Sequence, residues 1–274
     1  MAIRPKLNHP VCVWRADLPG PTDIQNEEPS LDGCSINHLS DIYLELPRSL
    51  FQVRGLMFLF NVVFVPFSVS LLWGVPYGGG AETFIIWIAC WLIFIWSVFV
   101  TLRSDISPPR DLPLRFNRLR RKMYVYEIDI VWWNPFIRWP IRAVAYDWDD
   151  VRAEAWLLHG AINGGHTMKW GVVLSIVKSG TNEVIDRFQL GAKGDGEAAW
   201  AYICTYMQEG PAALPPSDDL PRDHDNERTL NIAYLLAPKV KWPAEMDIES
   251  RTAPTESSCR DPLYGDCSVV EGKH

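Results

Sequence analysis

Three groups of side chains in this sequence are chemically capable of catalysis or ligand binding. His159 and His166 could bind a metal ion with a carboxylate such as Asp150, but they flank a glycine-rich stretch that fixes no coordination geometry. Asp147 and Asp149, beside Asp150, could serve acid–base catalysis or bind a cation. On a bend their side chains would diverge, so turn and capping roles are the better interpretation. We expect no metal site at either place.

The third group is the segment 191–196, which reads GAKGDG and precedes a predicted helix. Phosphate-binding loops stand in that position, but this segment lacks the GxxxxGK[ST] pattern that cradles phosphates. No serine or cysteine occupies a nucleophile elbow, and the six cysteines lack the CxxC pairs typical of zinc sites. They are interpreted as free thiols of a reducing compartment, because a Cys259–Cys267 disulfide would require a tail outside the cytosol. We therefore expect a non-enzymatic protein without a cofactor.

The elements that would position these groups divide into one very apolar block and a polar remainder. Residues 55–73 and 84–102 contain no charged residue, and each run is long enough, at roughly 28 Å, to cross the hydrocarbon core of a bilayer. A pair of buried core helices is the alternative, but such helices normally keep a polar stripe, which both runs lack. The sequence therefore predicts a transmembrane helical hairpin over residues 51–103, with Asn61 facing the partner helix.

Basic residues give this predicted hairpin an orientation. Arg48 and Arg54 precede the first run, a series of arginines follows the second, and the connecting turn 74–82 has neither Lys nor Arg. By the positive-inside rule, both termini are then cytoplasmic. The formal net charge of −7 argues against a general nucleic-acid binder, which needs a basic face.

Most of the remaining chain is predicted to form one cytoplasmic α+β domain over residues 104–210. Apolar and polar residues alternate in four segments, which predicts an antiparallel meander of strands; the segments are 123–131, 151–157, 168–176 and 184–190. Residues 159–166 are interpreted as a hairpin loop. One amphipathic helix follows, capped by Asp195 and ended by Gly210 and Pro211.

The two ends of the chain carry weaker patterns. Residues 1–50 are polar and are expected to be loosely ordered, with one short strand at 40–46. Residues 211–274 are Pro-rich and acidic, and we expect partial disorder there, above all beyond Arg251.

Two surface patches are candidate binding sites. The aromatic cluster Trp132, Trp133, Phe136 and Trp139 could be part of the core, a membrane-surface anchor or a partner-binding patch. A basic run follows the second apolar segment and could contact anionic lipid headgroups; it consists of Arg115, Arg118, Arg120, Arg121 and Lys122. Determination of membrane topology explains the same run equally well.

Several blocks of the sequence resemble known families. Residues 146–151 (YDWDDV) look like a feature of bacterial pleckstrin-homology-like domains attached to membrane hairpins. Together with residues 113–126 (PLRFNRLRRKMYVY) and 183–191 (EVIDRFQLG), they resemble an uncharacterised proteobacterial family of two-span membrane proteins. The resemblance covers residues 45–210. It implies a gene position beside type VI secretion effectors and a role as immunity or accessory protein, and the family has no established catalytic residues to transfer to this sequence.

This resemblance, together with the membrane hairpin, gives three functional hypotheses. The leading one is an immunity protein, anchored in the bacterial inner membrane, that binds membrane lipids and neutralises a toxic effector. A membrane-tethered accessory or scaffold protein of a secretion system is the second. An enzyme acting at the membrane through His159, His166, Asp149 and Asp150 is the third and the least favoured.

Overall fold

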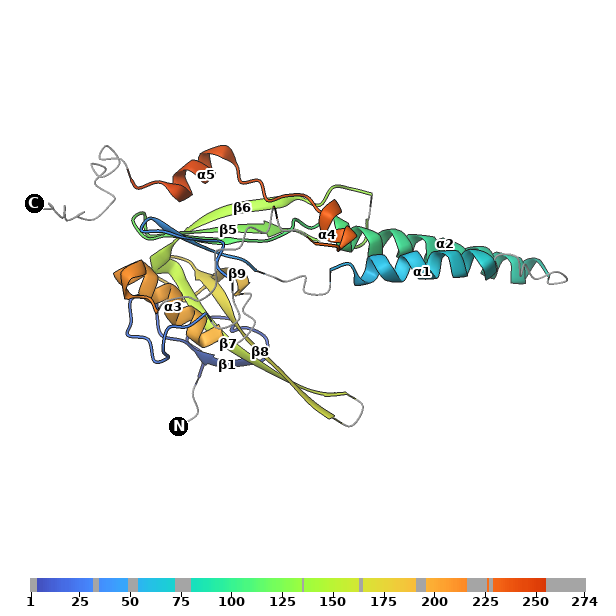
Figure 1. Ribbon diagram of the computed structural model, residues 1–274. Coiled ribbons are helices and arrows are strands. Elements are labelled where there is room, and N and C mark those ends of the chain that lie inside the picture. Colours follow the sequence, from blue (N-terminus) through green and yellow to red (C-terminus); the bar gives the residue numbers. More distant parts are fainter. Residues whose placement is uncertain are drawn as a thin grey trace, which may run out of the picture.

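The computed structural model describes residues 4–31, 35–48, 54–71, 80–134, 136–162, 165–190, 196–215, 226 and 229–254. Within these residues the chain forms two antiparallel β-sheets, a helix that packs against both, and a pair of long helices that projects from them (Figure 1). The predicted connecting turn at 74–82 and the chain end beyond 254 lie largely outside the described residues.

The five-stranded sheet has the order β2-β3-β4-β5-β6, and every neighbouring pair is antiparallel. Its strands are β2 (His38–Leu39), β3 (Tyr43–Leu46), β4 (Leu114–Asn117), β5 (Lys122–Ile128) and β6 (Ile141–Asp147). Strand β3 belongs to the N-terminal segment and pairs with β4, although the two apolar helices lie between them in the sequence. Both ends of the helix pair are thereby fixed to neighbouring strands of one sheet.

The four-stranded sheet has the order β1-β7-β8-β9 and is also antiparallel throughout. Its strands are β1 (Trp14–Asp17), β7 (Val151–Ile162), β8 (Gly165–Val177) and β9 (Val184–Leu190). A short 3-10 turn, Trp148–Asp150, leads from β6 into β7 and so connects the two sheets. The N-terminal segment therefore supplies β1, β2 and β3, where the sequence predicted one short strand.

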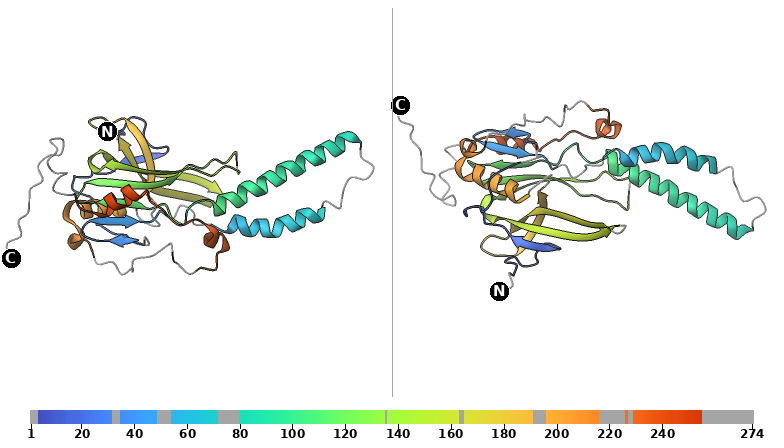
Figure 2. Two further views of the ribbon diagram at one scale, coloured as in Figure 1. Left: turned by 90° about the horizontal axis from the view of Figure 1, so that it is seen from above. Right: turned by 60° about the horizontal axis from the view of Figure 1, so that its bottom comes forward.

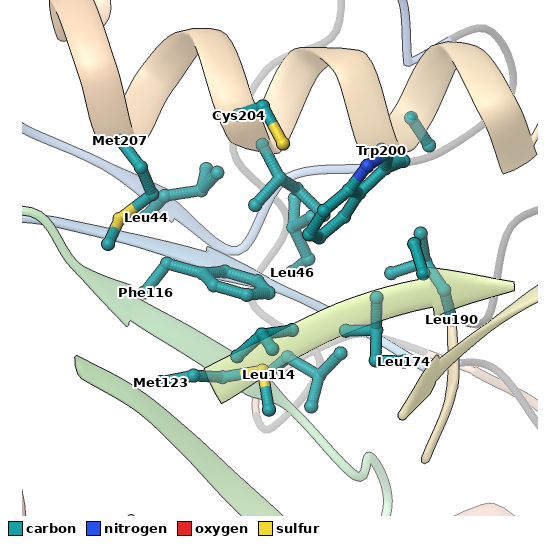
Figure 3. Close-up of a cluster of buried hydrophobic side chains, with 14 of the residues drawn as sticks. Leu44, Leu46, Leu114, Phe116, Met123, Leu174, Leu190, Trp200, Cys204 and Met207 are labelled. Atoms are coloured by element: carbon teal, nitrogen blue, oxygen red, sulfur yellow. The ribbon is translucent and has the colours of Figure 1, made fainter. Parts of the chain in front are cut away.

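The main core lies between the two sheets and helix α3 (Gly196–Glu209). Figure 3 shows Leu44, Leu114 and Phe116 of the five-stranded sheet meeting Leu174 of the four-stranded sheet under the helix. Trp200 of α3 is fully buried, and its ring centroid lies 5.4 Å from that of Trp148. Burial of so many large apolar side chains, each stabilising by about 1.5–3 kcal/mol, holds the sheets and the helix together.

Helices α1 (Leu56–Leu71) and α2 (Ala81–Ile106) lie side by side and point away from the sheets (Figures 1 and 2). Among the described helices only α2 is long and apolar enough to cross a membrane, whereas the apolar helix Leu56–Pro66 within α1 is shorter. At 1.5 Å per residue the 16 residues of α1 rise roughly 24 Å, which is short of a hydrocarbon core of about 30 Å. The predicted two-helix membrane hairpin is therefore wrong, and the fold is an α+β arrangement with one candidate spanning helix.

Contacts with the C-terminal segment fix the start of α1. Gly55 has a φ of +92°, a conformation that glycine adopts easily and other residues rarely, and a Cβ there would lie 2.5 Å from the Asn231 side chain. Asn231 also donates a hydrogen bond to the backbone oxygen of Arg54. The helix therefore begins directly after Gly55, close to the sheets.

The C-terminal segment runs along the five-stranded sheet. Helix α4 (Ile232–Leu236) contacts α2, and α5 (Ala244–Arg251) contacts β4. Between them, Val240 and Trp242 pack on Tyr126 in a second, smaller core. This part of the predicted acidic tail is folded onto the sheet.

Strands β7 and β8 form a long two-stranded arm. Their pairing runs without interruption from Val151–Ile176 to Ile162–Gly165, whereas β1 and β9 cover only the half nearest the core. The distal half projects from the sheet in Figure 1. The predicted hairpin connection at 159–166 is present, but its loop is shorter than predicted, because the strand pairing continues as far as Ile162 and Gly165. Residues 163–164 lie outside the described residues.

Candidate functional site

The surface of α2 is the first component of the candidate site. Its 26 residues rise roughly 39 Å, and none of its most apolar stretch is buried inside the protein. Large exposed apolar side chains cover it along most of its length: Phe84, Ile85, Ile86, Ile88, Leu92, Ile93, Ile95, Trp96 and Phe99. An exposed apolar area of this extent marks a surface that binds protein or lipid.

Polar contacts fix α1 to this helix. The Asn61 side chain, only 4% exposed, donates a hydrogen bond to the Thr101 hydroxyl at 2.9 Å and so faces the partner helix as predicted. The buried Asp105 carboxylate of α2 accepts hydrogen bonds from the backbone N–H groups of Gly55, at 3.0 Å, and Phe58, at 2.8 Å. A carboxylate at this position satisfies two N–H groups that a helix start leaves unpaired. Apolar side chains of both helices line a groove of about 450 Å³.

The loop 129–140, here called the aromatic loop, is the second component. Trp132, Trp133 and Phe136 are 65%, 62% and 72% exposed, whereas Trp139 is buried. The Phe136 ring lies 5.5 Å from the ring of Phe99. The cluster predicted from sequence is thus divided: three rings are exposed, with that of Phe136 beside α2, and the fourth belongs to the small core.

Backbone contacts hold this loop in place. The Asp129 N–H donates to the Pro140 carbonyl and closes the base of the loop at 3.0 Å. The Arg103 guanidinium, near the end of α2, donates to the Ile137 carbonyl at 2.9 Å. The part of the loop that contains Phe136 and Ile137 therefore lies beside the last turns of α2, where the apolar part of that helix gives way to charged residues. Tryptophan rings are enriched at such levels in membrane proteins, where water meets hydrocarbon.

The predicted basic run lies elsewhere. Arg115 is buried and forms ion pairs with Glu45 and, at 2.6 Å, with Asp247. Arg118, Arg120, Arg121 and Lys122 belong to or border the β4–β5 turn, at the end of the sheet away from α1 and α2 (Figure 1). Lys122 pairs with Glu249, Arg121 pairs with Asp149, and Arg120 donates to the Thr252 carbonyl.

The predicted catalytic and metal candidates are separated in the structure. His159 lies on β7 opposite Met168, and His166 lies on β8 opposite Ala161. Asp149 is in the 3-10 turn at the other end of β7. In the part of the chain that is described, no three His, Cys, Asp or Glu side chains come together as a metal site would require. Residues 191–195 of the glycine-rich segment lie outside the described residues.

Two polar clusters in the four-stranded sheet escaped the sequence analysis. The buried Glu154 carboxylate accepts a hydrogen bond from Ser175 at 2.5 Å and another from the backbone of Val11. Alternation placed Glu154 on the solvent side of β7, but the N-terminal segment covers that side. Only a sign that the N-terminal segment pairs with β7 could have revealed it.

The second cluster joins the two sheets. Asp186 of β9 accepts hydrogen bonds from Arg142 and Tyr146 of β6, at 2.5 and 2.7 Å. Burial opposes ionisation of Asp186, but these hydrogen bonds outweigh it and hold the pKa of the carboxyl below its ordinary value. Burial and the same hydrogen bond raise the pKa of the Tyr146 hydroxyl. Both groups therefore keep their ordinary charge at neutral pH, which suits a structural ion pair.

The arm formed by β7 and β8 is the third component. The pairs Leu157–Trp170 and His159–Met168 lie on one face of the ladder, because neighbouring pairs two residues apart point the same way. Trp170 is 57% exposed and Met168 is 51% exposed. The outer half of both strands has backbone edges that β1 and β9 do not cover. Such an edge can pair with a strand of another protein.

Comparison with known protein families places the sequence. The model of a family of unknown function, DUF6708, matches residues 91–254. The chain belongs to the DUF6708 family. The matched part begins within α2 and includes the aromatic loop, the arm and the C-terminal helices of this DUF6708 protein. Comparisons with curated proteins and with solved structures yielded no match.

Proposed function

We propose that this DUF6708 protein is a membrane-attached binding protein that neutralises a toxic effector of a type VI secretion system. In this proposal α2 inserts into the bacterial inner membrane, and the sheets present a surface to the toxin. The role as an immunity protein rests on the sequence blocks at 113–126, 146–151 and 183–191 and on their resemblance to proteins encoded beside such effectors.

The observation that carries membrane attachment is the exposed apolar surface of α2 together with the aromatic loop. Residues such as Ile85, Leu92 and Ile93 are 63–66% exposed, and leaving them in water would cost about 25 cal/mol for each Å² of apolar area. Phe136 lies beside the last turns of the helix, and Trp132 and Trp133 are exposed in the same loop, as expected for rings at a membrane–water interface. A single apolar helix flanked by an aromatic patch has the chemistry of a lipid anchor.

The arm supports the binding part of the proposal. Trp170 and Met168 are the kind of side chains that dominate protein–protein interfaces, and both are exposed on one face of a projecting ladder. The arm leaves the body at a different place from α2, so a membrane-attached protein would keep it available to a partner (Figure 1).

Cysteine labelling tests the insertion of α2. Cys90 is exposed on α2 and Cys12 is exposed near β1. In opened membrane fragments, a charged maleimide should label Cys12 rapidly and Cys90 only after denaturation in dodecyl sulfate, with peptide mass spectrometry as the readout. Labelling of Cys90 as fast as that of Cys12 would overturn membrane insertion.

Co-expression tests the immunity role. Cells that express the effector encoded next to this gene should survive when the protein is present and lose that protection when Trp170→Arg and Met168→Glu are combined. The matched control is Ile185→Glu, which places a charge at another exposed apolar position, on β9. Absence of protection and of co-purification would refute the role; capture of secretion components without protection would identify an accessory or scaffold protein instead.

A further inference from the structure

A basic pocket adjoins the base of α2. Its volume is about 530 Å³, and it lies between strands β5 and β6 on one side and the segment that joins α4 to α5 on the other. Arg138, from the aromatic loop, and Lys239 and Lys241, from the joining segment, line it. Figure 1 shows the joining segment passing along β6 after α4, which contacts α2.

Among the described residues, no carboxylate balances the charges of this pocket. No Asp or Glu of the described part of the chain lines it. The side chains of Arg138 and Lys241 form no ion pair within the described residues, and the Lys239 ammonium donates only to the Asn226 side-chain oxygen, at 2.9 Å.

Other cations on the same sheet are paired. Arg48 pairs with Glu127, Arg115 with Glu45 and Asp247, Lys122 with Glu249, and Arg142 with Asp186. In a chain with a formal net charge of −7, three exposed cations around one cavity form a local positive surface that attracts an anionic ligand.

The walls of the pocket are apolar and held in place. Trp242 packs on Tyr126 with ring centroids 5.2 Å apart, and the Lys241 N–H donates to the Tyr126 hydroxyl at 3.3 Å. Ile141, 43% exposed, adds an aliphatic wall. A pocket lined both by cations and by aromatic and aliphatic side chains suits a ligand whose phosphate is joined to an uncharged organic group.

We propose that this pocket binds the phosphate of an anionic phospholipid headgroup. The proposal rests on membrane attachment through α2, and it is the position of Arg138 that favours a lipid as the source of the phosphate. Arg138 directly follows Ile137, whose carbonyl accepts from Arg103 at the end of α2. A headgroup in the pocket would therefore lie at the level where α2 would leave the bilayer.

Titration of the full-length protein in a neutral detergent tests the proposal. Dihexanoyl phosphatidylglycerol should bind, measured by calorimetry, and dihexanoyl phosphatidylcholine should bind at least tenfold more weakly, because its ammonium cancels the phosphate charge. The double variant Lys239→Gln, Lys241→Gln should bind phosphatidylglycerol about thirtyfold more weakly, from roughly fivefold per cation. The matched control, Lys169→Gln with Lys178→Gln, removes two exposed lysines outside the pocket and should leave the affinity unchanged.

Soluble ligands separate the two possible sources of phosphate. Glycerol 1-phosphate should bind much more weakly than the lipid if the acyl chains or the micelle surface contribute. Equal binding of glycerol 1-phosphate, lost in the double pocket variant, would refute a lipid source and retain a phosphate pocket. Equal phosphatidylglycerol affinity in the pocket and control variants would overturn the pocket itself. Because glycerol 1-phosphate needs no membrane, this titration stays informative even if Cys90 labelling excludes insertion of α2.

Discussion

Replacement of Arg48 by Met should destabilise the protein more than any surface substitution. The Arg48 side chain is only 1% exposed at the end of β3. Its guanidinium donates to the Leu112 carbonyl at 2.8 Å, to the Tyr126 carbonyl at 2.7 Å and to the Glu127 carboxylate at 2.8 Å. Methionine fills much of the same volume but donates to none of these acceptors.

The expected loss of unfolding free energy follows from the hydrogen-bond acceptors and the carboxylate that remain without the guanidinium. Removal of one partner of a buried ion pair typically costs 3–5 kcal/mol, because the other charge stays in place without compensation. Glu127 is 21% exposed and can recover some hydration, so the lower end applies, and we expect a loss of about 3 kcal/mol. Of a total stability of roughly 5–15 kcal/mol, this is a large share.

Urea denaturation in a neutral detergent, followed by near-ultraviolet circular dichroism, measures this loss. The buried rings of Trp148 and Trp200 report the core. The control is Arg121→Met, which breaks an ion pair with Asp149 whose side chains are 44% and 69% exposed and should cost less than about 1 kcal/mol. A shift of the Arg48→Met midpoint no larger than that of the control would show that the buried guanidinium does not hold the sheet as argued.

Three further predictions concern single contacts. The wild type should be more stable than Asp186→Asn, and this difference in unfolding free energy should be complete above the ordinary carboxyl pKa of roughly 4. It should vanish as the pH falls through the lower pKa of the folded state, which denaturation across pH 2–7 measures. A difference that grows toward low pH would contradict this. Burial raises the pKa of the Cys204 thiol, so iodoacetamide at pH 8 should modify the exposed Cys12 and spare Cys204 until unfolding, and equal rates would refute this. Thr101→Val should weaken the packing of α1 on α2 by roughly 0.6 kcal/mol through loss of the Asn61 hydrogen bond, measured as faster hydrogen exchange in α1 with α3 unchanged.

The sequence predicts elements best where the signal is local. Helix α3 ends at Glu209, directly before the Gly210 and Pro211 that predicted its end, and its apolar face, which includes Trp200 and Cys204, is buried as expected. Strand β9, Val184–Leu190, has the predicted bounds, because a clear alternation follows a turn. Both signals depend only on neighbours within a few residues.

The errors arise where distant segments decide the structure. Strand β1 is held by β7, which lies more than a hundred residues away in the sequence, so no pattern within the N-terminal segment predicts it. For the same reason the basic pocket was missed, because Arg138 comes together with Lys239 and Lys241 only through the return of the C-terminal segment to the sheet.

The contacts that fix the backbone of the aromatic loop affect the affinity with which it can bind a surface. The hydrogen bond between Asp129 and Pro140 closes its base, and the buried Trp139 anchors it in the small core. The exposed rings of Trp132 and Phe136 thus project from a preorganised loop. When the loop docks on a surface, few of its backbone torsions need to be ordered, so most of the free energy gained from burying the rings remains available for affinity.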